Sequence, residues 1–305
     1  MLSRSAERVY WLGRYLERAE NTARIVQQYS QLLLDLPPEV GVKWHELLTI
    51  FGVDEARLGD SDVASIMHYM LADPTSNNSL AFCIRNARDN IRNARDLLPQ
   101  ESWESANELD QYARKYLGPA ATGENTFEVL SDCISHCQQI NGVLIGTMSH
   151  DSPYHFLRIG QNIERADMTS RIIDVAAAYL QKNERLVLRY GSTLWTNVLK
   201  SVSGFQMYRQ YCQPEVEGLS VIDFLLNDSK FPRAIRYCLQ RAHRRASALP
   251  RNQSLLSAID TTIERLPSPL PEELDGASVT ELMDLLQREF ATLHSVIVDT
   301  WFLPA

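Results

Sequence analysis

The sequence contains little glycine, no long apolar run and no excess of positive charge. Glycine contributes 13 of 305 residues, about 4 % against a usual level of roughly 7 %, which argues against sheet-rich folds and against glycine loops that cradle phosphates. No window approaches the roughly 18 apolar residues of a membrane span, and the charged N-terminal segment lacks an apolar signal core. The 38 acidic residues outnumber the 30 basic ones, which disfavours nucleic acid as a partner because phosphate binding depends on positive charge.

The five cysteines also lack the pattern of a disulfide framework. Their number is odd and no CxxC pair occurs, whereas such frameworks belong to secreted proteins with even, regularly spaced cysteines. We therefore expect reduced thiols, a cytoplasmic location and no membrane partner.

Motifs for metal binding or catalysis are missing as well. Glu17/Glu20 and Glu164/Asp167 each place two carboxylates three residues apart, as in helical di-metal sites, but those sites need a Glu-x-x-His element. Arginines crowd both pairs and would repel a cation. The sequence has no P-loop, dinucleotide fingerprint or zinc spacing, and no serine or cysteine nucleophile motif. We expect no metal, no cofactor and no catalytic residue.

What the sequence does contain is helical periodicity along almost its whole length. Apolar residues recur at three- and four-residue steps between positions 9 and 26, which is the stripe of an amphipathic helix. No segment alternates with the period of two that indicates strands. Asn125 with Glu128, and Ser278 with Glu281, have the spacing of helix N-caps. Further helices are predicted over 43–51, 62–72, 79–98, 102–116, 126–149, 153–182, 184–211, 220–227, 231–248, 253–265 and 279–302.

The chain also resembles itself. The segment LGRYLERAENTARIV at 12–26 matches IGQNIERADMTSRII at 159–173, with seven of fifteen positions identical at a shift of 147. Weaker matches follow in the same order along the chain. The sequence therefore predicts an all-α protein of helical bundles, built by tandem duplication with pseudo-twofold symmetry. The first repeat covers 1–150 and the second 151–305, and the short break between them favours one fused body.

The repeated pattern G-x-x-x-E-R-A-[ED]-x-T-x-R concentrates charge on one helix face. Three interpretations stay open. In the first, the charges form a solvated face of ion pairs. In the second, the motif helices cross and bury a mutually satisfied Arg–Glu network. In the third, the arginines bind a carboxylate or phosphate. The same Glu–Arg identities in both diverged copies argue against the first. The candidate ligand- or partner-binding residues are Glu7, Arg14, Glu17, Arg18, Glu20, Asn21 and Arg24, with Glu164, Arg165, Asp167 and Arg171 in the second copy.

These motifs resemble the bacterial Alpha-E domain family. The resemblance is carried by MLSRSAERVYWLGRYLERAENTAR at 1–24 and YHFLRIGQNIERADMTSRIIDV at 154–175, and extends over essentially the full chain. It implies an all-helical fold. It also implies a neighbouring or fused circularly permuted ATP-grasp protein, often with a transglutaminase-like protein nearby, and hence a system that makes or processes a peptide or amide-linked metabolite.

The resemblance and the motifs together lead to three functional hypotheses. The first is a non-catalytic helical partner or substrate-presenting subunit of an ATP-grasp ligase system, which binds a protein, carboxylate or phosphate through the duplicated Glu/Arg motif. The second is an enzyme of the same pathway, with Glu17 and Glu164 in acid–base roles. The third is a plain scaffold. The missing nucleophile and nucleotide motifs favour the first.

Overall fold

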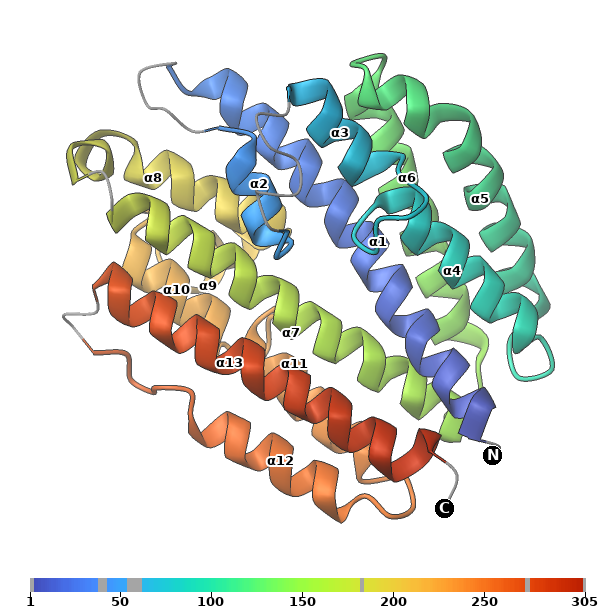
Figure 1. Cartoon of the computed structure of the whole chain (residues 1–305). Coiled ribbons are helices and arrows are strands. Elements are labelled where there is room, and N and C mark those ends of the chain that lie inside the picture. Colours follow the sequence, from blue (N-terminus) through green and yellow to red (C-terminus); the bar gives the residue numbers. More distant parts are fainter. Residues whose placement is uncertain (1–2, 38–42, 54–61, 182–183, 272–274, 304–305) are drawn as a thin grey trace.

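The computed structural model describes residues 3–37, 43–53, 62–181, 184–271 and 275–303. Every regular element over these residues is a helix, which confirms the all-α prediction (Figure 1). The helices are α1 (Ser3–Asp35), α2 (His45–Ile50), α3 (Val63–Leu71), α4 (Leu80–Asn93), α5 (Gln100–Ala121), α6 (Thr126–Thr147), α7 (Ser152–Gln181), α8 (Glu184–Ser201), α9 (Phe205–Tyr211), α10 (Gly218–Asn227), α11 (Ile235–Ala246), α12 (Gln253–Glu264) and α13 (Gly276–Ile297), which continues into a π-helical turn at Val298–Phe302.

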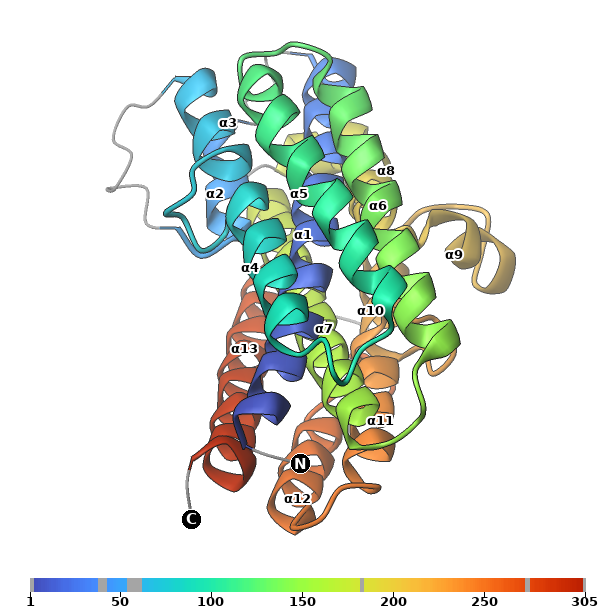
Figure 2. The ribbon, with the colours of Figure 1, turned by 90° about the vertical axis from the view of Figure 1, so that its right-hand side faces the viewer.

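The two longest helices, α1 and α7, lie at the centre. Helix α1 packs against α4 and α6, while α7 packs against α11 and α13. Helix α5 covers α4 and α6, and α12 covers α11 and α13. Figure 2 shows α4 and α13 on one flank of the central pair, and α6 and α11 on the other. One continuous cluster of buried apolar residues extends from Ala6 in α1 to Phe302 at the end of the π-helical turn. The central helices contribute to this core on several sides.

Two glycines allow α1 and α7 to cross in direct backbone contact. A Cβ atom added to Gly13 would lie 2.3 Å from the carbonyl oxygen of Leu157, and one added to Gly160 would lie 2.3 Å from the carbonyl oxygen of Tyr10. No larger residue fits at either position without moving a helix. From this crossing the helices diverge towards their C-terminal ends as a V (Figure 1).

Some predicted boundaries are wrong for local reasons. The single helix predicted over 184–211 is interrupted before α9, where Ser203 adopts a left-handed φ of 54°. Asn125 also has a left-handed conformation and makes no side-chain capping bond. The side chain of Asp275, rather than Ser278, caps α13, because it accepts a hydrogen bond from the Ser278 amide. A correct capping spacing is therefore not sufficient evidence of a cap.

No helix in the described part of the chain is both long and apolar enough to cross a lipid bilayer.

The crossing predicts opposite effects for the same substitution at different glycines. Gly13→Ala and Gly160→Ala should each lower the free energy of unfolding by about 1–3 kcal/mol, because the added methyl group overpacks a helix contact. Gly142→Ala is the matched control. That residue is an exposed glycine inside α6 with open space around it, so alanine should raise stability by up to about 1 kcal/mol. Urea unfolding of the three variants measures this, and equal effects at Gly13 and Gly142 would contradict the close crossing.

Candidate functional site

Just beyond the glycine crossing, Glu164 of α7 receives two arginines from α1. Nε of Arg18 lies 2.5 Å from Oε1 of Glu164, and its Nη2 lies 3.0 Å from Oε2. Nε of Arg14 donates to Oε2 of the same carboxylate. Glu164 is only 1 % exposed, so this carboxylate is compensated by guanidinium groups rather than by water.

The converse arrangement surrounds Glu17 of α1. Arg165 of α7 donates from Nε to Oε1 at 2.9 Å and from Nη2 to Oε2 at 2.6 Å. Nη1 of Arg233, from the turn before α11, reaches Oε1 at 2.8 Å. Glu17 is fully buried. Each motif helix therefore supplies a glutamate to the other and an arginine that binds the other's glutamate.

Arg233 extends the pairing along α1. Its Nη1 donates to Oδ1 of Asn21, and its Nη2 lies 3.0 Å from Oε1 of Glu20. Arg24 donates to the same Glu20 oxygen at 2.7 Å, one helical turn away. The sequence analysis missed Arg233 because it lies outside both copies of the motif. Its sequence signal is weak, because it stands in the segment FPRAIRYCL at 231–239, three residues from both Lys230 and Arg236.

Burial and arginine contact act in opposite directions on these carboxyl groups. Burial alone would raise the pKa of Glu164, but Arg14 and Arg18 outweigh it and lower the pKa to about 2. Burial likewise opposes the effect of Arg165 and Arg233 on Glu17, whose pKa is also lowered. Both carboxylates are therefore held in the charged form.

One further arginine approaches this group without a carboxylate partner. Arg158 donates from Nη1 to Oε1 of Gln161 at 2.7 Å, but its buried Nε has no acceptor in the described structure. Burial and the positive charge of Arg165 lower the pKa of Arg158. We use the term arginine–glutamate network for Arg14, Arg18, Arg24, Arg158, Arg165 and Arg233 together with Glu17, Glu20 and Glu164.

Aromatic side chains cover the network on the α4–α13 flank. The Tyr10 hydroxyl accepts a hydrogen bond from Nη1 of Arg14 at 2.9 Å and lies 3.0 Å from Nδ1 of His294 on α13. Trp11 stacks on Tyr15, with ring centroids 5.4 Å apart. Trp11 and Tyr15 are only partly buried, so this flank combines arginine with accessible aromatic surface.

The remaining candidate residues lie outside the network. Asp167 and Arg171 form an ion pair of 3.1 Å within α7. Glu7 is exposed and makes no ion pair with any described residue. The solvated-face interpretation is wrong for Glu17, Glu20 and Glu164, which are all buried. Their carboxylates point at arginines, and no cluster of three metal-binding side chains occurs in the ranges that the structure covers.

Comparison with known proteins identifies the family. A family model named Alpha-E, a predicted alpha-helical domain with a conserved ER motif, matches residues 1–302. The chain belongs to the Alpha-E family. In this Alpha-E chain, the Glu-Arg dipeptides at Glu17–Arg18 and Glu164–Arg165 supply the reciprocal ion pairs between the central helices. No solved structure matches the chain.

Three similar Alpha-E relatives are mycobacterial proteins described as uncharacterised. One is from Mycobacterium bovis and two are from strains of Mycobacterium tuberculosis; each is 22 % identical over 320 residues, covering 95 % of this chain. The chain spans about a third of their length, since the match covers 35 % of each relative.

The lowered pKa values predict an acid-sensitive contribution from Glu164. Its folded pKa of about 2 lies below the ordinary 4.5, so the stabilisation is complete above that ordinary value and is lost as the pH falls towards the folded one. Glu164→Gln should lower the free energy of unfolding by about 3–5 kcal/mol at pH 7, because it leaves the buried Arg14 and the partly buried Arg18 without their carboxylate. The deficit should shrink between pH 5 and pH 3, as measured by urea unfolding. Glu128→Gln, at an exposed position, is the control, and a pH-independent deficit would argue against this electrostatic origin.

Proposed function

We propose that this Alpha-E chain is a non-catalytic helical subunit of an ATP-grasp peptide or amide ligase system. It binds the ligase, or a ligand carrying a carboxylate or phosphate, through the arginines of its network. A circularly permuted ATP-grasp protein is the proposed partner, and a transglutaminase-like protein is a second one. The proposed location is the cytoplasm, in line with five cysteines that are all free thiols.

The observation that carries this proposal is the surplus of positive charge in the network. Five arginines form ion pairs with three glutamates within a largely buried volume, and Arg158 lies beside them without an ion pair. Uncompensated charge in such surroundings is costly and attracts an anion. The side chains of Arg18 and Arg165 remain 17 % and 15 % exposed, which leaves them within reach of one.

The proposal includes a tandem duplication with halves 1–150 and 151–305 joined in one body. Exchanging corresponding residues at the shift of 147 converts the Arg18–Glu164 pair into the Arg165–Glu17 pair. The same exchange relates the two glycine contacts at the crossing. The packing order α1, α4, α5, α6 also corresponds to α7, α11, α12, α13. Such reciprocity is what a pseudo-twofold axis between the motif helices would produce.

The enzymatic alternative receives less support. Glu17 and Glu164 would have to exchange protons, but arginines hold both pKa values near 2 despite burial. A general acid or base works best with a pKa near the operating pH. The mycobacterial relatives are almost three times as long as the region they share with this chain, so in them this region is joined to further sequence. Such a fusion favours a role beside a partner.

Arg158 offers a test that separates binding from folding. Arg158→Gln removes a positive charge that has no carboxylate partner, so the free energy of unfolding should change by less than about 1 kcal/mol. Affinity for the proposed partner, a circularly permuted ATP-grasp protein, should fall at least tenfold. Isothermal titration calorimetry, at two salt concentrations, measures the affinity of the full-length proteins.

Arg244→Gln is the matched control, since Arg244 is an exposed arginine of α11 outside the network. It should leave the affinity unchanged. A wild-type chain that binds neither the ATP-grasp protein nor a carboxylate or phosphate would contradict the proposal. So would a purified chain that turns over ATP or a peptide by itself.

A further inference from the structure

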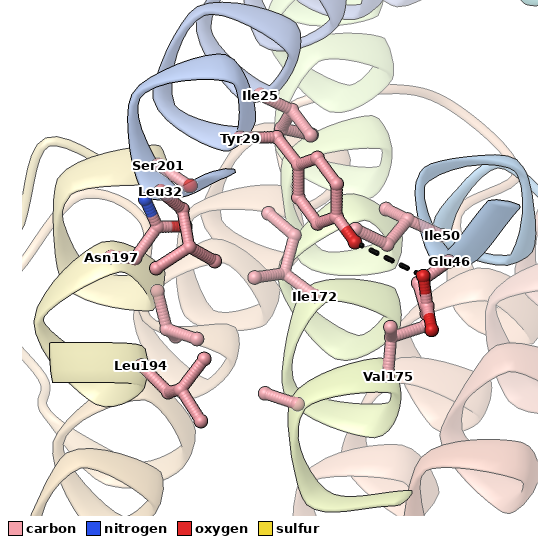
Figure 3. Close-up of a pocket in the computed structure, with 12 residues that line it drawn as sticks. Ile25, Tyr29, Leu32, Glu46, Ile50, Ile172, Val175, Leu194, Asn197 and Ser201 are labelled. Atoms are coloured by element: carbon pink, nitrogen blue, oxygen red, sulfur yellow. Dashed lines mark hydrogen bonds between the residues drawn. The ribbon is translucent and has the colours of Figure 1, made fainter. Parts of the chain in front are cut away.

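A second feature of the fold is an apolar pocket at the open end of the V, separate from the arginine–glutamate network. Helices α1, α2, α7 and α8 line it (Figure 3). Ile25 and Ile172, which correspond at the shift of 147, come from the two central helices, and Leu194 and Val198 come from α8. The pocket exists because the central helices diverge here and the side chains of α2 and α8 do not fill the gap completely.

The pocket has room for a slim ligand. Its cavity volume is about 60 Å³, several times the roughly 10–15 Å³ that one water molecule needs. The lining is mainly aliphatic, so water gains few hydrogen bonds there, and an apolar group that displaces it is favoured. A short alkyl chain fits this space.

The polar groups at the edge of the pocket define the charge of its ligand. Glu46 is the single charged residue among those lining it. Oε2 of Glu46 accepts a hydrogen bond from the Lys43 amide at 2.7 Å. It also lies 3.3 Å from the Tyr29 hydroxyl, which donates to the Lys43 carbonyl oxygen at 2.7 Å. Its Oε1 makes no hydrogen bond or ion pair with a described residue. Figure 3 shows this carboxylate between Tyr29 and Val175.

A second acceptor lies on the α8 side of the pocket. Nδ2 of Asn197 donates to the Gln28 carbonyl oxygen at 2.7 Å, which leaves its Oδ1 without a donor among the described residues. The available polar atoms of Glu46 and Asn197 are therefore acceptors, and one of them is anionic. Donor groups and positive charge complement them; a carboxylate would be repelled.

We propose that this pocket binds a small aliphatic primary amine. The alkyl chain lies between Ile25, Ile172, Leu194 and Val198, and the ammonium group donates to the Glu46 carboxylate. Amide formation consumes an amine and a carboxylate, so an amine site would serve the ligase system. That link rests on the proposed function, whereas the binding itself does not.

Matched probes of equal chain length test the charge preference. Hexylammonium chloride, sodium heptanoate and 1-hexanol, which all carry a hexyl chain, are titrated into the full chain by calorimetry, without any partner protein. Hexylammonium should bind saturably and at least tenfold more tightly than heptanoate. Glu46→Gln should weaken hexylammonium binding at least tenfold and leave hexanol binding unchanged. Glu108→Gln, at an exposed position of α5, should change neither.

Ala176→Phe fills the pocket and should abolish binding of both hexylammonium and hexanol, with circular dichroism confirming that the variant folds. The proposal is overturned if hexylammonium does not bind to the wild-type chain, if heptanoate binds equally well, or if Glu46→Gln retains full affinity for hexylammonium. None of these results bears on binding of the ATP-grasp protein, so the two proposals fail separately.

Discussion

The fold depends on the reciprocal burial of glutamate and arginine between two helices that touch at glycine. A buried carboxylate needs donors on the opposite helix, and those donors reach it only if the helix backbones approach closely. Gly13 and Gly160 permit that approach, and Glu17 and Glu164 then lie within reach of Arg165 and Arg18. Close approach at the glycines and pairing of arginine with glutamate are therefore both needed to hold α1 and α7 together.

The remaining features follow from this crossing. Because the central helices are held together near their N-terminal ends, they diverge at the other end, where α2 and α8 enclose an apolar pocket. Because arginines outnumber glutamates in the network, the end of the V at which α1 and α7 cross keeps a surplus of positive charge. The two proposals therefore assign different chemistry to the two ends: an anion at the network and a cation at the pocket with Glu46.

Periodicity and self-comparison predicted the helical class, nearly all helices and the residues that pair across the crossing. They left burial of the charged face as one of three interpretations, because an apolar stripe opposite charges normally marks a helix that is exposed to solvent on one side. Helix α1 instead has neighbours on every side, a property of tertiary packing. Arg233 was missed for a similar reason: it reaches Glu17 from more than two hundred positions away. The left-handed Ser203 that interrupts the predicted 184–211 helix has no composition signal of its own beyond the adjacent Gly204.

A double-mutant cycle on Arg18 and Glu164 tests the central claim most directly. Arg18→Met, Glu164→Gln and the double variant are unfolded in urea at pH 7. The corresponding cycle uses Arg92→Met and Asp89→Asn in the more exposed pair Arg92–Asp89, whose charged atoms lie 3.7 Å apart. The account predicts a coupling energy of about 1–3 kcal/mol for the buried pair and below about 0.5 kcal/mol for the exposed one. Equal, near-zero coupling in both cycles would contradict the claim that reciprocal Arg–Glu pairing joins the central helices.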